Sequence, residues 1–413
     1  MADDGADAVF VRGPRGAFAP LRHRNFRLLW TGMLVSQTGS WMQFVALGYL
    51  IDQLTKAPIY LGLLGLAQAV PRLLFAFLGG VAADRLDRRR VLLWTNTLLM
   101  LSAVSLWALA YTGRIQVWHI LAIGAFNSLT SSFDAPARHS MVPGLVHERQ
   151  ILSALSLTSM ANNGSGIFGP SLGGLIIAAV GVVGCFFVNA LSYTGVLIAL
   201  LLMDVREQEA GSRESFGSDI REGIGLLFRH RHLLALLGVV AVLNFFGRPY
   251  VRLMPALARE VLHVGPKGLG ILQSAPAVGT ILAVFFVNAF ADEAGKGRLL
   301  LGAAISTGLL VALFGLSRWF DLSIGLLVLV GTGQAVALAS ANTLVQTTVK
   351  PEQRGRMMGL YNMVSFGMFA LGTLPMGALA GVVGVGRALT LGGLIVVALV
   401  GLLTVSSPKV AKL

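Results

Sequence analysis

The sequence contains little cysteine and little charge, and both shortages limit what the protein can be. Cys185 is the only cysteine among 413 residues, so the chain has no internal disulfide and no cysteine-based metal site. The seven histidines show no metal-ligand spacing, and we expect neither a metal nor a cofactor. Only 12% of the residues are charged, whereas soluble globular proteins have about a quarter. A soluble fold is therefore excluded.

Patterns typical of nucleotide-driven and nucleic-acid-binding proteins are also missing. The glycine-rich run 265–270 does not have the spacing of a phosphate-binding loop, so direct use of ATP would require a partner. The net charge of +13 does not indicate nucleic-acid binding, because the basic runs border long apolar segments. We expect no nucleic-acid partner and no enzymatic activity.

Long apolar runs dominate the chain, which is 55% hydrophobic with a mean hydropathy of +0.75. A helix needs about 20 apolar residues to cross a bilayer core. The sequence therefore predicts an all-α membrane protein with twelve transmembrane helices in two pseudo-symmetric six-helix bundles. The predicted spans are 28–50, 59–83, 91–112, 117–135, 157–180, 182–203, 233–256, 268–291, 298–317, 322–346, 357–380 and 387–406.

These spans define the predicted domains. Residues 28–203 and 233–406 form the two bundles, and residues 1–27 and 407–413 form the tails. The linker 204–232 is either a solvated connection or an amphipathic helix at the membrane surface, with Ser218 at its start. Most of the 32 lysines and arginines fall on the side of the tails and the linker. The positive-inside rule places that side, with both termini, in the cytoplasm.

A duplicated motif supports the two-bundle arrangement. The sequence GLAQAVP at residues 65–71 returns as GILQSAP at 270–276, about half a chain later. Pro71 and Pro276 occupy equivalent positions in the two copies, and Gly169 and Pro170 interrupt the fifth span. Proline removes a backbone hydrogen bond, so a bend is expected at each of these positions; plain packing of small residues is the alternative. The expected bend residues are Pro71, Gly169, Pro170, Gly173, Gly174 and Pro276.

Three further motifs resemble those of one transporter family. GVAADRLDRRRVL at residues 80–92 resembles the loop between the second and third helices of the major facilitator superfamily. FDAPAR at 133–138 and PEQRGRMM at 351–358 resemble its drug and siderophore exporters, which include enterobactin exporters and macrolide efflux proteins. GPSLGG at 169–174 resembles a fifth-helix antiporter motif. The resemblance covers the whole chain.

The arginine-rich motif also has a physical interpretation. A carboxylate beside arginines and a helix terminus forms charge-assisted contacts that hold two bundles together on the cytoplasmic side. The alternative is that these arginines fix only the topology. The predicted cytoplasmic latch consists of Gly80, Asp84, Arg85, Arg88, Arg89, Asp134 and Arg138.

Carboxylates avoid the middle of every predicted span, which leaves few proton-coupling candidates. Asp134 is either a proton relay or a fixed partner in the latch. Asp52, near the outer end of the first span, is the second relay candidate or else a solvated residue.

Arginines and amides inside the spans are the candidates for substrate binding. Arg248 and Arg252 are spaced i, i+4 on one predicted helical face, where they receive an anionic group or extend toward the lipid headgroups. Amides in a bundle point toward neighbouring helices or into a cavity. The substrate-binding candidates are Gln37, Gln43, Gln68, Arg72, Asn127, Asn163, Asn244, Arg248, Gln273, Gln334, Asn342 and Asn362.

The resemblance implies a monomeric secondary transporter in the bacterial inner membrane. It would export a small amphipathic drug-like compound or siderophore by alternating access, in exchange for protons. Two alternatives stay open at this point: a flippase for lysophospholipids or other lipids, and a membrane sensor with the same fold but no transport.

Overall fold

The computed structural model describes residues 18–204, 231–290, 295–350 and 353–406, and all regular structure in these ranges is helical. The predicted all-α membrane class is confirmed. The first half begins with a 3₁₀ turn η1 (Ala19–Arg22). Its long helices are α2 (Arg24–Thr55), α3 (Pro58–Arg85), α4 (Arg88–Tyr111), α5 (Val117–Met141) and α6 (Ile151–Leu202), with the 3₁₀ turns η2 (Val142–Leu145) and η3 (Glu148–Gln150) between α5 and α6.

The second half begins after the described range resumes at residue 231. Its elements are α8 (Arg231–Val242), the π-helical turn η4 (Leu243–Gly247), α9 (Tyr250–Glu260), α10 (Pro266–Phe290), α11 (Lys296–Leu316), α12 (Phe320–Thr348), α13 (Arg354–Val383) and α14 (Val385–Ser406). The predicted amphipathic helix of the linker and both predicted tails lie outside the described residues, apart from a few at their edges.

Nine helical stretches in the described ranges are long and apolar enough to cross a bilayer. One of them, Glu148–Leu202, has 55 residues, which at 1.5 Å per residue would exceed twice the thickness of a bilayer core. The chain reverses inside it at Gly181, whose φ of 75° is a conformation that glycine adopts readily. Because of this reversal, the Cys185 thiol reaches the carbonyl of Gly173, only twelve residues earlier. The break falls where the fifth and sixth predicted spans were divided.

The predicted seventh span is interrupted, which the sequence analysis did not foresee. It was expected as one helix over 233–256, but α8 gives way to the π-helical turn at Leu243 and α9 starts only at Tyr250. Pro249, the residue before α9, lacks the backbone N–H that a continuous helix would use. Arg248 thus precedes α9, so the prediction of one helical face for Arg248 and Arg252 is wrong.

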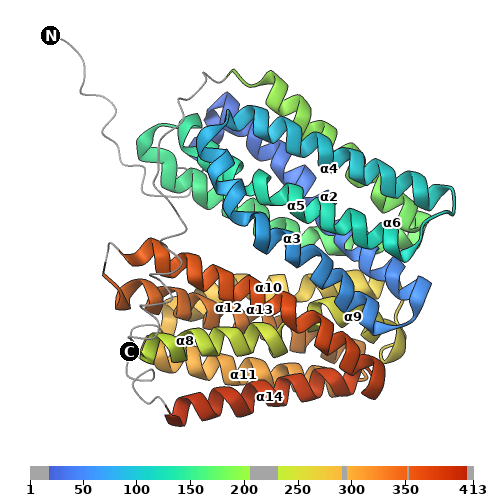
Figure 1. Ribbon diagram of the computed structural model, residues 1–413, viewed down its shortest axis with the longest axis vertical. Coiled ribbons are helices and arrows are strands. Elements are labelled where there is room, and N and C mark those ends of the chain that lie inside the picture. The colour runs from blue at the N-terminus through green and yellow to red at the C-terminus, as the bar shows by residue number, and fades with distance from the viewer. Residues whose placement is uncertain (1–17, 205–230, 291–294, 351–352, 407–413) are drawn as a thin grey trace.

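The two halves lie side by side and touch mainly toward one end (Figure 1). We call this the closed end; it carries Asp52, Pro58, Arg259 and Pro266. The other end, where Arg88 begins α4, is called the basic end. In Figure 1 the ribbons of α2 and α3 reach α9 at the closed end and diverge from the second half toward the basic end.

The hydrophobic core follows the same division. One cluster of buried residues contains members of both halves, among them Ile51 and Leu61 from the first and Leu257 and Phe314 from the second. Toward the basic end each half has its own cluster: one around Phe26 and Leu200 in the first half, another around Leu236 and Leu344 in the second. The halves are therefore fused at the closed end and packed separately elsewhere.

Glycines of the duplicated motif permit this fusion. A Cβ on Gly270 of α10 would stand 3.0 Å from the Cα of Gly174 on α6, and the reverse distance is the same. A Cβ on Gly65 of α3 would stand 2.6 Å from the hydroxyl of Thr373 on α13. The equivalent glycines of both copies thus lie where a helix of one half crosses a helix of the other, which gives the repeat a structural reason.

Helices α3, α6 and α10 continue through Pro71, Pro170 and Pro276, so the chain forms no loop at these positions. In the fifth-helix motif, Gly169 and Gly173 approach α2, where added Cβ atoms would lie 2.5 Å from Trp41 and 3.0 Å from Met42. The bends predicted at these residues stay a prediction.

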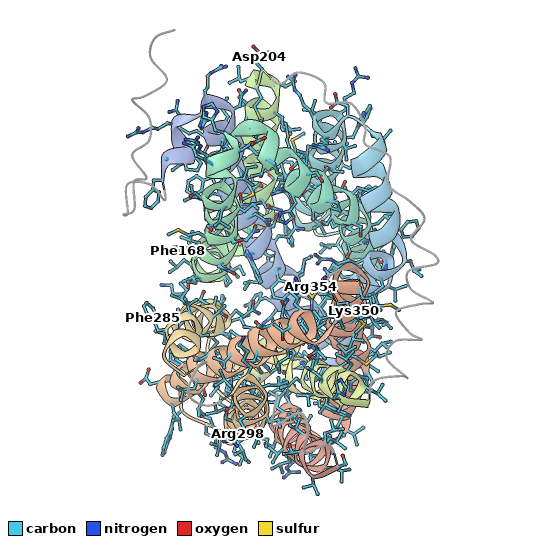
Figure 2. The ribbon with its side chains drawn as sticks, turned by 90° about the vertical axis from the view of Figure 1, so that its left-hand side faces the viewer. Phe168, Asp204, Phe285, Arg298, Lys350 and Arg354 are labelled. Atoms are coloured by element: carbon cyan, nitrogen blue, oxygen red, sulfur yellow. The ribbon has the colours of Figure 1, made fainter. Side chains whose placement is uncertain are left out.

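The lateral surface is apolar. Phe168 and Phe285 lie on the same side of the two facing halves in Figure 2, and their side chains are largely exposed. Exposed aromatic and aliphatic residues are spread over most helices, which is the surface that a lipid bilayer accommodates.

Replacing Gly174 by valine should force α6 and α10 apart. The new Cβ would lie 2.5 Å from the carbonyl oxygen of Pro266, closer than side chains approach. Overpacking of this kind costs about 1–3 kcal/mol, so we expect a lower melting temperature for the purified protein. Gly164→Val on the same helix is the matched control, because nothing lies within 4 Å of its added Cβ. Equal melting temperatures of the two variants would contradict this account of the junction.

Candidate functional site

The interrupted seventh span places two arginines in the middle of the molecule. Asn244 is fully buried in the π-helical turn, where its amide nitrogen donates to the carbonyl of Val240 and its oxygen accepts from Arg248 at 3.2 Å. The Arg248 guanidinium lies over the ring of Phe369, 4.8 Å from its centroid. A π-helical turn redirects side chains and is frequent at functional sites. Here it turns Arg248 toward α13.

Arg252, one turn into α9, connects the two halves. Its guanidinium donates to the amide oxygen of Gln68 on α3 and lies over the ring of Phe44 on α2, 4.5 Å from the centroid. The inward direction contradicts the alternative that Arg252 extends to the headgroups. Gln273 lines the same small pocket, and its amide oxygen is buried without a hydrogen-bond partner, as is Nε of Arg252.

Arg72, on α3 of the first half, adds a third cation to Arg248 and Arg252 of the second half. It follows Pro71 on α3, and its guanidinium lies over the ring of Phe366 on α13, 5.3 Å from the centroid. Arg248 is within electrostatic range of both Arg72 and Arg252. We call Arg72, Arg248 and Arg252 the arginine cluster. The structure thus brings together five of the predicted substrate residues, Gln68, Arg72, Asn244, Arg248 and Gln273, and adds Arg252 to them.

A second charged site closes the molecule at the closed end. Both carboxylate oxygens of Asp52 on α2 accept from Arg259 on α9, at 2.6 and 2.9 Å. Asp52 is 2% exposed, so it is not the solvated residue of one sequence interpretation. Arg259 also donates to Glu260 at 2.9 Å and to the carbonyl of Lys56 at 3.5 Å. We call the Asp52–Arg259 pair the closed-end clamp, because it joins the two halves.

Asp134 belongs to a buried network inside the first half. It accepts from Thr95 at 3.1 Å and from Asn96 at 2.9 Å on α4, and it pairs with Arg138 one turn along α5. Arg138 Nη1 and Asn96 Oδ1 are buried without partners. A buried, paired carboxylate with unsatisfied neighbours is a group whose protonation would rearrange its surroundings.

The basic end carries the remaining residues of the predicted latch. Asp87 caps α4 by accepting from the backbone of Arg90 at 2.8 Å. Arg88 donates to the carbonyl of Ser140, and Arg89 donates to those of Leu200 and Leu201. These contacts tie α4 to α5 and α6 within the first half. The side chains of the last turns of α3, which include Gly80, Asp84 and Arg85, lie outside the described part.

Three of the seven other predicted amides hold helices of one half together. Gln37 donates to Asn162 at 3.1 Å, Gln43 accepts from Asn189 at 2.7 Å, and Asn127 accepts from Ser102. Asn342 accepts from Gln346 one turn along α12, and the amide nitrogen of Gln334 is buried without a partner. Asn163 and Asn362 are exposed. None of these is adjacent to the arginine cluster through a described contact.

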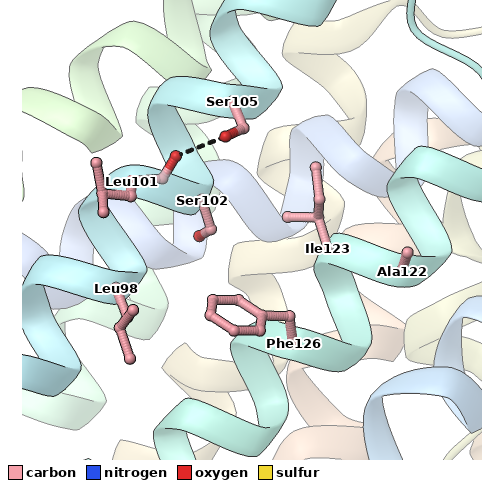
Figure 3. Close-up of a pocket in the computed structure, with 7 residues that line it drawn as sticks. All are labelled: Leu98, Leu101, Ser102, Ser105, Ala122, Ile123 and Phe126. Atoms are coloured by element: carbon pink, nitrogen blue, oxygen red, sulfur yellow. Dashed lines mark hydrogen bonds between the residues drawn. The ribbon is translucent and has the colours of Figure 1, made fainter.

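A larger pocket lies away from the interface of the halves. It is a shallow groove between α4 and α5, lined by Leu98, Leu101, Ser102, Ser105, Ala122, Ile123 and Phe126 (Figure 3). Its lining is apolar, and the hydroxyl of Ser105 is bound to the carbonyl of Leu101 at 2.9 Å. Leu98, Leu101 and Phe126 are exposed, so the groove belongs to the lateral surface.

Sequence reasoning missed three residues of the site. Phe366 and Phe369 on α13 hold guanidinium groups, but phenylalanine in an apolar helix gives no signal of this role. Arg259 was not among the predicted site residues, and nothing in its sequence context indicates that it reaches Asp52 over a separation of 207 positions.

Known proteins resemble this chain along almost its whole length. An uncharacterized MFS-type transporter of Bacillus subtilis (strain 168) is 28% identical, over 94% of this chain and 95% of the relative. Macrolide efflux protein A of Streptococcus pyogenes is 21% identical over 90% and 93%. An enterobactin exporter of Shigella boydii is 24% identical over 86% and 85%.

The fold is also found among solved structures. A mutant of the nucleoside transporter NupG superposes with a TM-score of 0.79 at 14% identity, covering 92% of this chain and 99% of that one. The family profile described as transmembrane secretion effector matches residues 15–412. Together with the relatives, this match shows that the chain belongs to the transmembrane secretion effector family of the major facilitator superfamily, whose members are membrane transporters rather than enzymes.

Proposed function

We propose that this protein exports a small amphipathic molecule across the bacterial inner membrane by alternating access, in exchange for protons. One observation carries the proposal: both halves share a hydrophobic cluster and an ion pair at the closed end, whereas each half has its own cluster toward the basic end. Such a molecule is closed on one side, and rocking the halves about the central site would open that side.

The proposed architecture has twelve spans. They are α2 to α5, the two limbs of α6 on either side of Gly181, the interrupted span α8–α9, and α10 to α14. Residues 28–203 and 233–406 form the two bundles. The equivalent contacts of Gly65 and Gly270 across the interface support a pseudo-symmetric relation between the bundles. The tails 1–27 and 407–413 and the linker 204–232 lie on the cytoplasmic side, together with the basic end.

The two charged networks would act at opposite ends. In the conformation described here, the closed-end clamp holds the halves together, and the predicted latch would do so at the basic end in the opposite conformation. Arg88 and Arg89 already fix α4 against α5 and α6, so this part of the latch moves as one body. Gly80, Asp84, Arg85, Asp134 and Arg138 complete the proposed latch.

Asp52 and Asp134 are the proposed proton-coupling residues. Protonation of Asp52 would remove the charge that holds Arg259, and protonation of Asp134 would release Arg138. Protonation of Asp52 would thus favour opening of the closed end. The alternative for Asp134 is a fixed structural pair, since its partners all lie in the first half.

The named relatives move macrolides and enterobactin, and both compounds set the size range expected for the exported molecule. The arginine cluster with Gln68, Asn244 and Gln273 is the proposed binding site, because it lies where both halves meet and where the seventh span is interrupted between α8 and α9.

Replacing Asp52 by asparagine should open the closed end. The change removes the partner of Arg259 in the first half and leaves only Glu260 on its own helix; the penalty is on the order of 1–3 kcal/mol, because Arg259 is partly exposed. In a Cys185→Ser background, a cysteine at Val251 lines the pocket below the clamp. We expect its labelling by a membrane-impermeant maleimide, measured at one pH, to accelerate severalfold in Asp52→Asn.

Glu260→Gln is the matched control for the clamp. Glu260 binds the same guanidinium but is 30% exposed, and it joins no helix of the first half through a described contact. In the Glu260→Gln variant, the cysteine introduced at position 251 should be labelled at the same rate as in the protein with the intact clamp. Equal rates in Asp52→Asn and Glu260→Gln would contradict a closing role for Asp52.

Replacing Asp134 by asparagine should abolish gradient-driven transport if Asp134 carries the proton. Proteoliposomes with a proton gradient would be tested with labelled macrolides, siderophores and lysolipids, with the exposed Asp204→Asn as a control. We expect gradient-dependent flux in the wild type and in Asp204→Asn, and none in Asp134→Asn.

The other outcomes of the flux assay are equally informative. Gradient-independent flux in all three proteins would remove Asp134 as a relay and favour a facilitator or a lipid flippase. Absence of flux for every compound in the panel, with the protein folded, would contradict export of these substrate classes and revive the sensor hypothesis.

A further inference from the structure

The arginine cluster has more positive charge than its surroundings neutralise. None of its three members forms an ion pair in the part of the chain that the structure describes. Asp52 and Asp134, the buried carboxylates of the described ranges, are bound to Arg259 and Arg138 instead. The cluster is therefore left with amides and aromatic rings as its partners.

Aromatic rings stabilise these cations but do not neutralise them. A cation over a ring gains about 0.5–2 kcal/mol, and each guanidinium of the cluster has one such ring. A charge inside a membrane protein costs more than this unless an opposite charge or water accompanies it. Like charges within electrostatic range of one another, as Arg248 is with Arg72 and Arg252, add repulsion. Arg72 is exposed, so this cost falls on Arg248 and Arg252, and an anion beside them would relieve it.

Unsatisfied hydrogen-bonding atoms occur at the same place. Nε of Arg252 is a buried donor without a partner, and Oε1 of Gln273 in the same pocket is a buried acceptor without one. Buried polar atoms are nearly always paired, so unpaired ones in a binding region indicate groups that a ligand satisfies. A molecule with oxyanion and hydroxyl groups satisfies both atoms, whereas a cation satisfies neither Nε nor the excess charge.

The rings also determine the shape of such a ligand. The guanidinium carbons of the cluster lie 4.5–5.3 Å from the ring centroids of Phe44, Phe366 and Phe369, and each of Arg248 and Arg252 donates one described side-chain hydrogen bond, so further N–H groups are open to a ligand. The planar N–H edge of arginine matches a carboxylate or a pair of phenolate oxygens in two hydrogen bonds. Phe44 and Phe366 come from the half opposite to their arginine, so a ligand bound here contacts both halves at once.

We propose that the transported molecule is an amphipathic organic oxyanion, such as a polycarboxylate or a carboxylate that bears a catechol, and that the arginine cluster binds it. The proposal rests on the transport function proposed above and assigns its substrate class. It excludes cationic amphiphiles as preferred cargo, because the cluster repels them.

The test measures the binding of an anion, its uncharged derivative and a cation to the purified full-length chain. The probes are 2,3-dihydroxybenzoylserine, its methyl ester with both phenols methylated, and a cationic macrolide. We expect the anion to raise the melting temperature and the other two to leave it unchanged. The apparent affinity for the anion should fall as salt is added, because the attraction is electrostatic.

Variants separate binding from folding. Arg248→Gln and the exposed Arg72→Gln should each weaken anion binding roughly tenfold or more, the loss expected for one charge-assisted contact. The melting temperature of either variant without ligand should equal or exceed that of the wild type, since a repelling charge is removed. Arg387→Gln, an exposed arginine at the start of α14, is the matched control and should bind like the wild type.

Three results would overturn the proposal: equal stabilisation by the uncharged ester, preferential binding of the cation, or unchanged anion affinity in both cluster variants. The flux assay of the preceding subsection keeps the two proposals separate. Gradient-driven flux of an uncharged or cationic compound, unaffected by Arg248→Gln, would leave the exporter proposal standing and refute the anion preference.

Discussion

The structure depends on the junction at the closed end, where both halves bury one shared hydrophobic cluster. Glycine pairs bring α6 to α10 and α3 to α13, and the closed-end clamp crosses the same region. Removing apolar surface from contact with water or lipid headgroups gives the junction its strength, while the close glycine contacts give it its register. The described residues form no such shared cluster at the basic end. The junction is therefore the point about which one half would move against the other.

The arginine cluster lies next to that junction, and its placement follows from the interruption of the seventh span. A regular seventh span would have carried Arg248 and Arg252 on one face. The π-helical turn and Pro249 instead separate them, so Arg248 turns toward Phe369 while Arg252 crosses to Gln68 and Phe44. Charge that is stabilised by rings rather than by carboxylates stays available to a ligand. The interrupted helix thus links the fold to the proposed binding chemistry.

The sequence predicted the parts of this account that depend on local composition. Long apolar runs predicted the helices, Gly181 coincided with the predicted division of two spans, and the family motifs predicted the family. The residues GLAQAVP and GILQSAP predicted a duplication, and the structure gives their glycines equivalent contacts. These features are readable because each depends on neighbouring residues along the chain.

Contacts between distant segments were not predictable in this way. The partnership of Asp52 with Arg259 and the rings of Phe366 and Phe369 under guanidinium groups depend on how the two halves approach each other. Pro249 lies inside the predicted seventh span, but α3, α6 and α10 continue through their prolines, so a proline alone did not indicate the interruption between α8 and α9. Asn127 and Gln43 show the opposite case: amides that looked suitable for a cavity bind Ser102 and Asn189 on neighbouring helices.

The central claim is that the closed end and the basic end open in alternation. Spin-label distances measure this directly in a Cys185→Ser background, with one pair at Arg114 and Arg318 on the closed end and another at Leu152 and Lys296 on the basic end. We predict that acidification with saturating dihydroxybenzoylserine lengthens the closed-end distance and shortens the basic-end distance. Distances that stay unchanged, or that change in the same direction at both ends, would contradict alternating access.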